Sequence, residues 1–66
     1  MRVLVNGELR ELPPGATVAT LVAALGAGDR GVAVAIGDEV VPRSGWETTA
    51  LGDGVRVEVL MAVQGG

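Results

Sequence analysis

Residues 55–61 read Val-Arg-Val-Glu-Val-Leu-Met, and this stretch decides the fold. Its side chains alternate between two faces with a period of two residues, which predicts a strand with one buried face. One face would carry Val55, Val57, Val59 and Met61, and the other Arg56, Glu58 and Leu60. A strand of this kind must bury its apolar face against a second layer of structure. The rest of the chain therefore has to supply neighbouring strands and a covering helix.

The start of the chain predicts two of these neighbouring strands. Residues 1–5 alternate in the same way, and an Asn-Gly pair follows at 6–7. This pair is a strong hairpin signal, because both central residues of a type I′ turn need positive φ. Residues 8–12 would form the returning strand, which a Pro-Pro-Gly run ends because proline cannot donate to a β-ladder. With a right-handed helical crossover, the first and last strands can lie parallel in the centre of one mixed sheet.

A single helix is predicted after Thr17, which is a good N-cap residue. Gly26 stands where a C-cap glycine belongs. Between them, one apolar stripe with the spacing i, i+3, i+4 and i+7 is formed by Val18, Leu21, Val22 and Leu25. The opposite face is rich in alanine and carries no charge. That face is either an ordinary exposed surface or a docking surface.

The second half of the chain adds further strands. Residues 32–36 alternate as a third strand, and a short strand at 40–41 ends at a proline. Residues 44–50 are expected to be irregular around Trp46, whose indole would plug one end of an aliphatic core and bond to the backbone. The predicted fold is therefore α+β, a mixed four- to five-stranded sheet with one helix packed across it. Residues 1–66 would form a single domain with a flexible C-terminal tail at about 62–66.

The composition excludes most forms of side-chain catalysis. The chain has no Cys, His, Lys or Tyr. Disulfides and thiolate metal sites are therefore impossible, as are general acid–base chemistry by His and nucleophilic chemistry by Cys or Lys. The eight acidic residues are scattered singly apart from Asp38 and Glu39, which indicate a turn. We therefore expect a protein that is not an enzyme and that binds no metal or cofactor itself.

The charge pattern argues against two classes of partner. The net charge is −3, and the five Arg residues are dispersed along the chain, which is not the basic patch that nucleic-acid binding requires. No apolar run approaches the roughly 18–20 residues of a membrane span. The expected protein is soluble and cytoplasmic, with neither nucleic-acid nor membrane partners.

The end of the sequence carries the functional signal. From Val59 onward no side chain is ionisable, and the chain closes with Val63, Gln64, Gly65 and Gly66. Glycine lacks Cβ, so such a tail can enter a narrow channel and deliver its carboxylate into a partner's active site. Activation by adenylation would then use ATP and Mg²⁺ held by the partner, because this chain has no phosphate-binding loop. The alternative is a frayed end without function.

The pattern resembles a known family over nearly the whole chain, the sulfur-carrier protein of thiazole (thiamin) biosynthesis, which is ubiquitin-like and has the β-grasp fold. The residues that carry the resemblance are Ala33-Val34-Ala35-Ile36, Val41-Pro42-Arg43, Trp46, Leu51, Asp53-Gly54 and Val63-Gln64-Gly65-Gly66. Gly37 and Val55 depart from it, since the family commonly has Asn and Asp there. Both departures concern local turn geometry and leave the tail unchanged.

The resemblance implies a β-grasp fold and a set of partners. An adenylating enzyme of the ubiquitin-activating type would attach AMP to Gly66, and a persulfide from a cysteine desulfurase or another donor would convert it to a thiocarboxylate. Thiazole synthase would then take the sulfur. By this resemblance Gly66 is the modified residue, while Val63, Gln64 and Gly65 thread into the partner.

Three further residues are candidates for a partner surface. Leu4 and Leu60 are predicted to point away from the helix, where exposed apolar residues can mark a docking site or be ordinary surface. Arg43 could pair with acidic groups of a partner or remain a solvated surface charge. Three alternative functions stay open: the sulfur carrier of molybdopterin synthesis, a ubiquitin-like protein modifier, and an interaction module with an inert tail.

Overall fold

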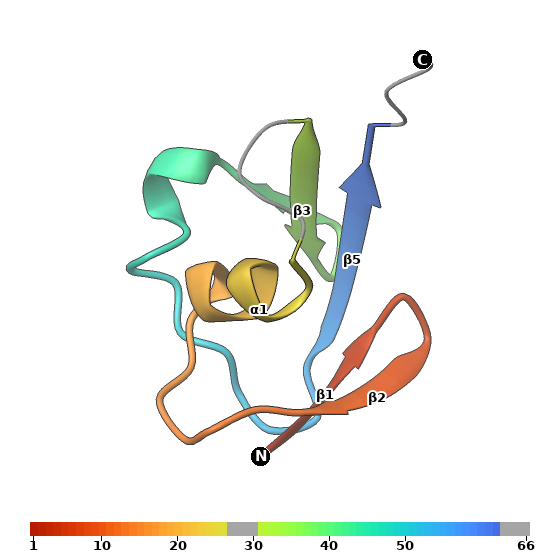
Figure 1. Cartoon of the computed structure of the whole chain (residues 1–66), viewed down its shortest axis with the longest axis vertical. Coiled ribbons are helices and arrows are strands. Elements are labelled where there is room, and N and C mark those ends of the chain that lie inside the picture. Colours follow the sequence, from red (N-terminus) through yellow and green to blue (C-terminus); the bar gives the residue numbers. More distant parts are fainter. Residues whose placement is uncertain (27–30, 63–66) are drawn as a thin grey trace.

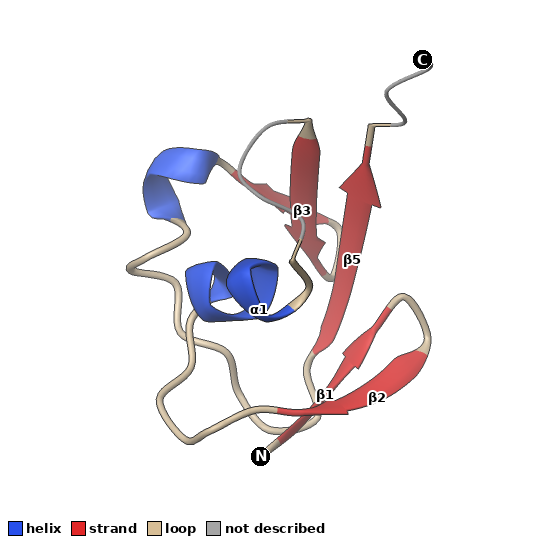
Figure 2. Cartoon of the chain, in the orientation of Figure 1, coloured by secondary structure: helices blue, strands red, loops and turns tan. Residues whose placement is uncertain are grey.

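The computed structural model describes residues 1–26 and 31–62, and these form one mixed sheet with a helix across one face (Figures 1 and 2). The sheet has five strands in the order β2-β1-β5-β3-β4. The elements in chain order are β1 (Arg2–Val5), β2 (Glu8–Glu11), α1 (Val18–Ala24), β3 (Val32–Ile36), β4 (Glu39–Val41), the 3₁₀-helix η1 (Arg43–Gly45) and β5 (Arg56–Met61). The predicted α+β architecture is confirmed.

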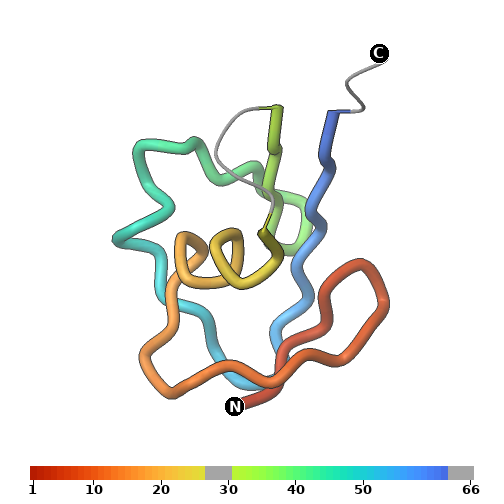
Figure 3. The backbone as a smooth tube through the Cα atoms, viewed as in Figure 1, coloured from red at the N-terminus to blue at the C-terminus, as the bar shows by residue number. Residues whose placement is uncertain are grey.

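The central strand is β5, which pairs with β1 on one side and β3 on the other. The β1–β5 pair is parallel, with Val5 opposite Val57, whereas the other three pairs are antiparallel. This is the parallel arrangement of first and last strands that the sequence predicts. The traced backbone shows that the N-terminus and the end of β5 lie at opposite ends of the molecule (Figure 3).

Local signals position the elements as predicted. In the β1–β2 turn, Asn6 has φ 50° and Gly7 has φ 85°, the positive values that a type I′ turn needs. The Thr17 hydroxyl accepts a hydrogen bond from the Thr20 amide at 3.3 Å and completes a capping box at the start of α1. Gly26, at φ 69°, donates to the Ala23 carbonyl at 3.0 Å and ends the helix.

The core lies between α1 and the sheet and is almost entirely aliphatic. Its buried members are Val3, Val5, Leu12, Ala16, Val18, Leu21, Val22, Val34, Trp46, Leu51, Val57 and Val59. No polar or charged side chain is buried within the described residues. The indole of Trp46 donates to the Val41 carbonyl at 2.9 Å, as predicted. The segment expected to be irregular overlaps η1 instead. The backbone of Pro42 is still extended, and the amides of Gly45 and Trp46 then bond back to the carbonyls of Pro42 and Arg43.

Leu21→Ala should destabilise the domain strongly. Leu21 is fully buried between α1 and the sheet, and truncating such a side chain costs about 2–5 kcal/mol. Urea denaturation followed by circular dichroism measures this change. Leu60→Ala is the control, since that side chain is 70% exposed and should shift the free energy of unfolding by less than about 0.5 kcal/mol. Equal effects of both substitutions would contradict the assigned core.

Candidate functional site

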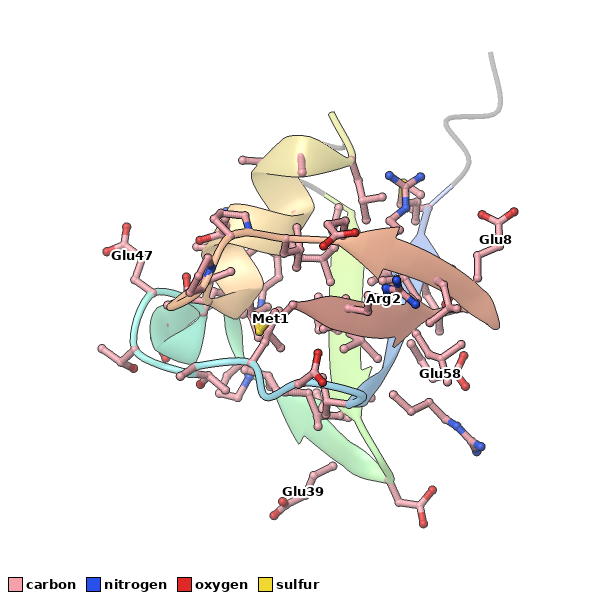
Figure 4. All side chains as sticks on the ribbon, turned by 90° about the horizontal axis from the view of Figure 1, so that it is seen from below. Met1, Arg2, Glu8, Glu39, Glu47 and Glu58 are labelled. Carbon is pink, nitrogen blue, oxygen red and sulfur yellow. The ribbon has the colours of Figure 1, made fainter. Side chains whose placement is uncertain are left out.

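The described residues contain no cluster of catalytic or metal-binding side chains. No group of three or more Asp and Glu residues able to hold a metal ion occurs in this part of the chain. Seen from below, the labelled Glu8, Glu39, Glu47 and Glu58 spread around the periphery and point outward in different directions (Figure 4). These four carboxylates therefore do not converge on one point of the described surface.

The end of β5 is the feature of the fold that is closest to the predicted tail. On the β3 side, Met61 lies opposite Val32, and the Ala62 amide donates to the Gly31 carbonyl at 2.6 Å. Gly31 has φ 67°, and a Cβ added there would lie 3.0 Å from the Cβ of Ala62. The positive φ and the close approach both favour glycine here, and the hydrogen bond from Ala62 to Gly31 holds the chain immediately before the tail.

On the other side of β5, the side chain of Asn6 holds the strand. Its Nδ2 donates to the Val59 carbonyl at 3.0 Å, and its Oδ1 accepts from the Val59 amide at 2.8 Å. The sequence analysis assigned Asn6 only to the hairpin turn and missed this contact. The sequence feature related to this contact is that Asn, and not Gly or Asp, occupies position 6 of the turn. This residue type alone does not indicate a hydrogen-bond partner far away in the sequence.

Of the three predicted partner-surface residues, the structure brings two together. Leu60 is 70% exposed and lies on the sheet face away from α1, with Ala33 opposite it on β3. A shallow groove at this end of the sheet is lined by Gly31, Val32, Ala33, Arg43, Leu60, Met61 and Ala62. Arg43 and Leu60 therefore border the same groove, where β5 ends.

Leu4 lies on the same sheet face but outside this groove. It is half-buried and stands opposite Arg56, four residues before Leu60 along β5, a separation of about 13 Å. Its direct neighbour is Leu9 on the edge strand β2, which is 63% exposed. The helix-free face thus carries two separate apolar areas, one at each end of β5.

The predicted tail residues Val63, Gln64, Gly65 and Gly66 lie outside the described part of the chain. The site is therefore defined by the structure up to Ala62: a strand end held from both sides, beside a groove with apolar and cationic walls. Within the described ranges, no helix has the length and apolar character needed to cross a membrane.

Comparison with known proteins identifies the family. The sequence matches the ThiS family model over residues 3–66, which includes the last residue of the sequence. The chain belongs to the ThiS family. The resemblance that the sequence indicated, to the sulfur carriers of thiamin biosynthesis, is therefore confirmed.

Two solved structures support the family assignment. The crystal structure of the thiamine biosynthesis protein ThiS from Geobacter metallireducens is similar with a TM-score of 0.79 at 30% sequence identity, and the match covers all of both chains. The solution structure of a thiamine biosynthesis protein from the same organism gives a TM-score of 0.83 at 30% identity, covering all of this chain and 88% of the other. The ThiS β-grasp fold predicted from the sequence is confirmed.

A curated relative is considerably longer. This ThiS-family chain is 36% identical over its full 66 residues to a thiazole synthase from Paramagnetospirillum magneticum. The match spans about one fifth of that protein's length, since it covers 20% of it. A region similar to this chain therefore occurs within a polypeptide named as a thiazole synthase.

Gly31→Ala should weaken the anchoring of β5 in this ThiS-family domain. Positive φ costs an alanine about 1–2 kcal/mol, and the added Cβ would crowd Ala62. We expect a lower free energy of unfolding and faster amide exchange at Ala62, measured by denaturation and NMR.

The matched control for this substitution is Gly52→Ala. Gly52 has open space around its Cβ position and is not among the residues with positive φ. Alanine there should be neutral or stabilising by up to about 1 kcal/mol. If the two substitutions behave alike, Gly31 has no special role at the end of β5.

Proposed function

We propose that this chain carries sulfur as a thiocarboxylate on Gly66 and donates it to a thiazole synthase in thiamin biosynthesis. The observation that carries the proposal is the family match, which extends through Gly65 and Gly66. A partner of the ubiquitin-activating type adenylates the carboxylate, and a persulfide donor fed by a cysteine desulfurase supplies the sulfur. The reaction takes place in the cytoplasm.

The chemistry belongs to the partners because this chain has no suitable side chains. The sequence contains no Cys, His or Lys, so no thiol, imidazole or lysine amine is available in it, and its own contribution is the terminal carboxylate. A carboxylate oxygen of Gly66 attacks the α-phosphorus of ATP, and pyrophosphate leaves. Mg²⁺ and cationic groups of the partner stabilise the charge on the phosphates.

Sulfur enters in two further steps. The terminal sulfur of the persulfide attacks the acyl carbon, the C–O bond to AMP breaks, and an acyl disulfide forms. A second thiolate then attacks the donor-side sulfur of that disulfide, which releases the thiocarboxylate and leaves a disulfide on the donor. This balance requires cysteine thiols from outside the chain, in agreement with its lack of cysteine.

The longer relative supports thiazole synthase as the acceptor. The relative named thiazole synthase contains a region that is 36% identical to this chain, and this region makes up one fifth of its length. Joining a carrier to its acceptor in one polypeptide raises the effective concentration of each for the other. We infer that a thiazole synthase is likewise the acceptor for the sulfur that this chain carries.

Deleting Gly66 should abolish sulfur loading without unfolding the domain. The last buried core residue is Val59, seven positions before Gly66, so the deletion leaves every core residue in place. Mass spectrometry after incubation with the adenylating enzyme, ATP, Mg²⁺ and a persulfide donor is the assay. The intact chain should gain the mass difference for one oxygen replaced by sulfur, and the shortened chain should gain nothing.

Two controls make this test decisive. The addition of one alanine after Gly66 should also prevent loading, because it displaces the carboxylate, and circular dichroism should show unchanged folding in both variants. Covalent adducts on other proteins would instead indicate a protein modifier. Thiocarboxylate formation by the shortened chain would exclude Gly66 as the modified residue.

Leu60→Gln should weaken docking to the adenylating enzyme. Leu60 is exposed beside the groove at the end of β5, and a partner that accepts the tail has to cover this area. We expect KM for the carrier to rise about tenfold with little change in the free energy of unfolding. Leu9→Gln is the matched control, since Leu9 is similarly exposed but lies on the edge strand β2. An unchanged KM for Leu60→Gln would remove Leu60 from the partner surface.

A further inference from the structure

The Asn6 side chain connects two segments that are 53 residues apart in the sequence. The carboxamide of Asn6 donates to the Val59 carbonyl and accepts from the Val59 amide, so both of its polar groups bond to the same residue. These bonds are 3.0 and 2.8 Å long and partly buried. A turn residue needs neither of them, so the side chain of Asn6 has a role beyond the turn.

The position of these bonds follows from the parallel ladder between β1 and β5. The amides of Leu4 and Asn6 donate to the carbonyls of Val55 and Val57 at 2.8 and 3.0 Å. The next bond of this ladder would need the amide of Glu8, two positions after Asn6, to donate to the Val59 carbonyl. At that point the chain has already turned into β2, and the Asn6 carboxamide takes the place of the missing peptide group.

Beyond Val59, the described part of β5 has no further hydrogen bond to β1 or its turn. On the β3 side, pairing continues through Met61, and the Ala62 amide bonds to the Gly31 carbonyl. The last residues of β5 are therefore held by β3 on one side and finally by Asn6 on the other. Loss of the Asn6 contact would leave one edge of β5 unpaired from Val59 onward.

We propose that Asn6 is a positioning residue, which fixes the end of β5 and so determines where the chain delivers the Gly66 carboxylate. This inference rests on the proposed function. Gly66 follows Ala62 by only four positions, so the end of β5 sets the region that its carboxylate can reach. Misplacement of a reacting group by about 1 Å can lower a rate up to a hundredfold. Asn6 itself touches neither ATP nor the acyl group.

The test uses Asn6→Gly in the full chain. Glycine accepts positive φ, so the turn is preserved while both bonds to Val59 are lost. Asp38→Gly is the matched control: it adds a glycine to the β3–β4 turn, and Asp38 makes no hydrogen bond to β5 in the described structure. Asn6→Asp is a second variant, which keeps the acceptor for the Val59 amide but loses the donor for its carbonyl.

Two measurements separate positioning from general stability. Pyrophosphate release by the adenylating enzyme, at varied carrier concentration, should show a kcat about tenfold lower for Asn6→Gly, with KM changed less than twofold. Asn6→Asp should lower kcat in the same direction, and Asp38→Gly should change neither constant. Amide exchange by NMR should accelerate at Val59 in Asn6→Gly more than at Val57.

The outcomes are distinct. A wild-type kcat for Asn6→Gly, or a decrease shared by Asp38→Gly, overturns the positioning role. Unchanged exchange at Val59 overturns the clamp itself. If the unaltered chain releases no pyrophosphate, the proposed function fails and the positioning role fails with it, while exchange at Val59 still decides whether Asn6 secures β5.

Discussion

The parallel pairing of β1 with β5 is the interaction on which the rest of the structure depends. It joins the two ends of the chain, since the Leu4 amide bonds to the Val55 carbonyl across 51 positions. Parallel neighbours require a crossover, and α1 supplies it on the face that buries Val57 and Val59. Once β5 is central, β1 and β2 extend the sheet on one side, and β3 and β4 extend it on the other.

This central placement relates the fold to the function. A strand paired on both sides forms a rigid base, and its last described residues are held by Asn6 and by Gly31. The chain therefore presents whatever follows Ala62 from a defined point at the end of the central strand. Under the proposed function this arrangement favours the carrier, because its terminal carboxylate has to reach an active site that belongs to another protein.

The sheet is covered on one face only, and the two faces have different roles. The α1 side holds the aliphatic core with Trp46 at its end, which is most of what 66 residues can bury. On the helix-free side, Leu60 is 70% exposed and Leu9 is 63% exposed. Their separation matters, since only Leu60 lies beside the groove where β5 ends.

The sequence by itself determined the strands, the helix and the family resemblance that points to the tail. Alternation at 55–61, the cap at Thr17 and the turn at 6–7 are local signals, set by steric preferences of a few neighbouring residues. The absence of Cys, His and Lys likewise excluded thiol, imidazole and lysine chemistry by side chains without any structure. Only the tertiary structure showed that Asn6 bonds to Val59, that Gly31 contacts Ala62 closely, and that Leu4 lies apart from Leu60. These contacts depend on the register between strands distant in sequence, and periodicity reports which face a side chain occupies but not which residue stands opposite it.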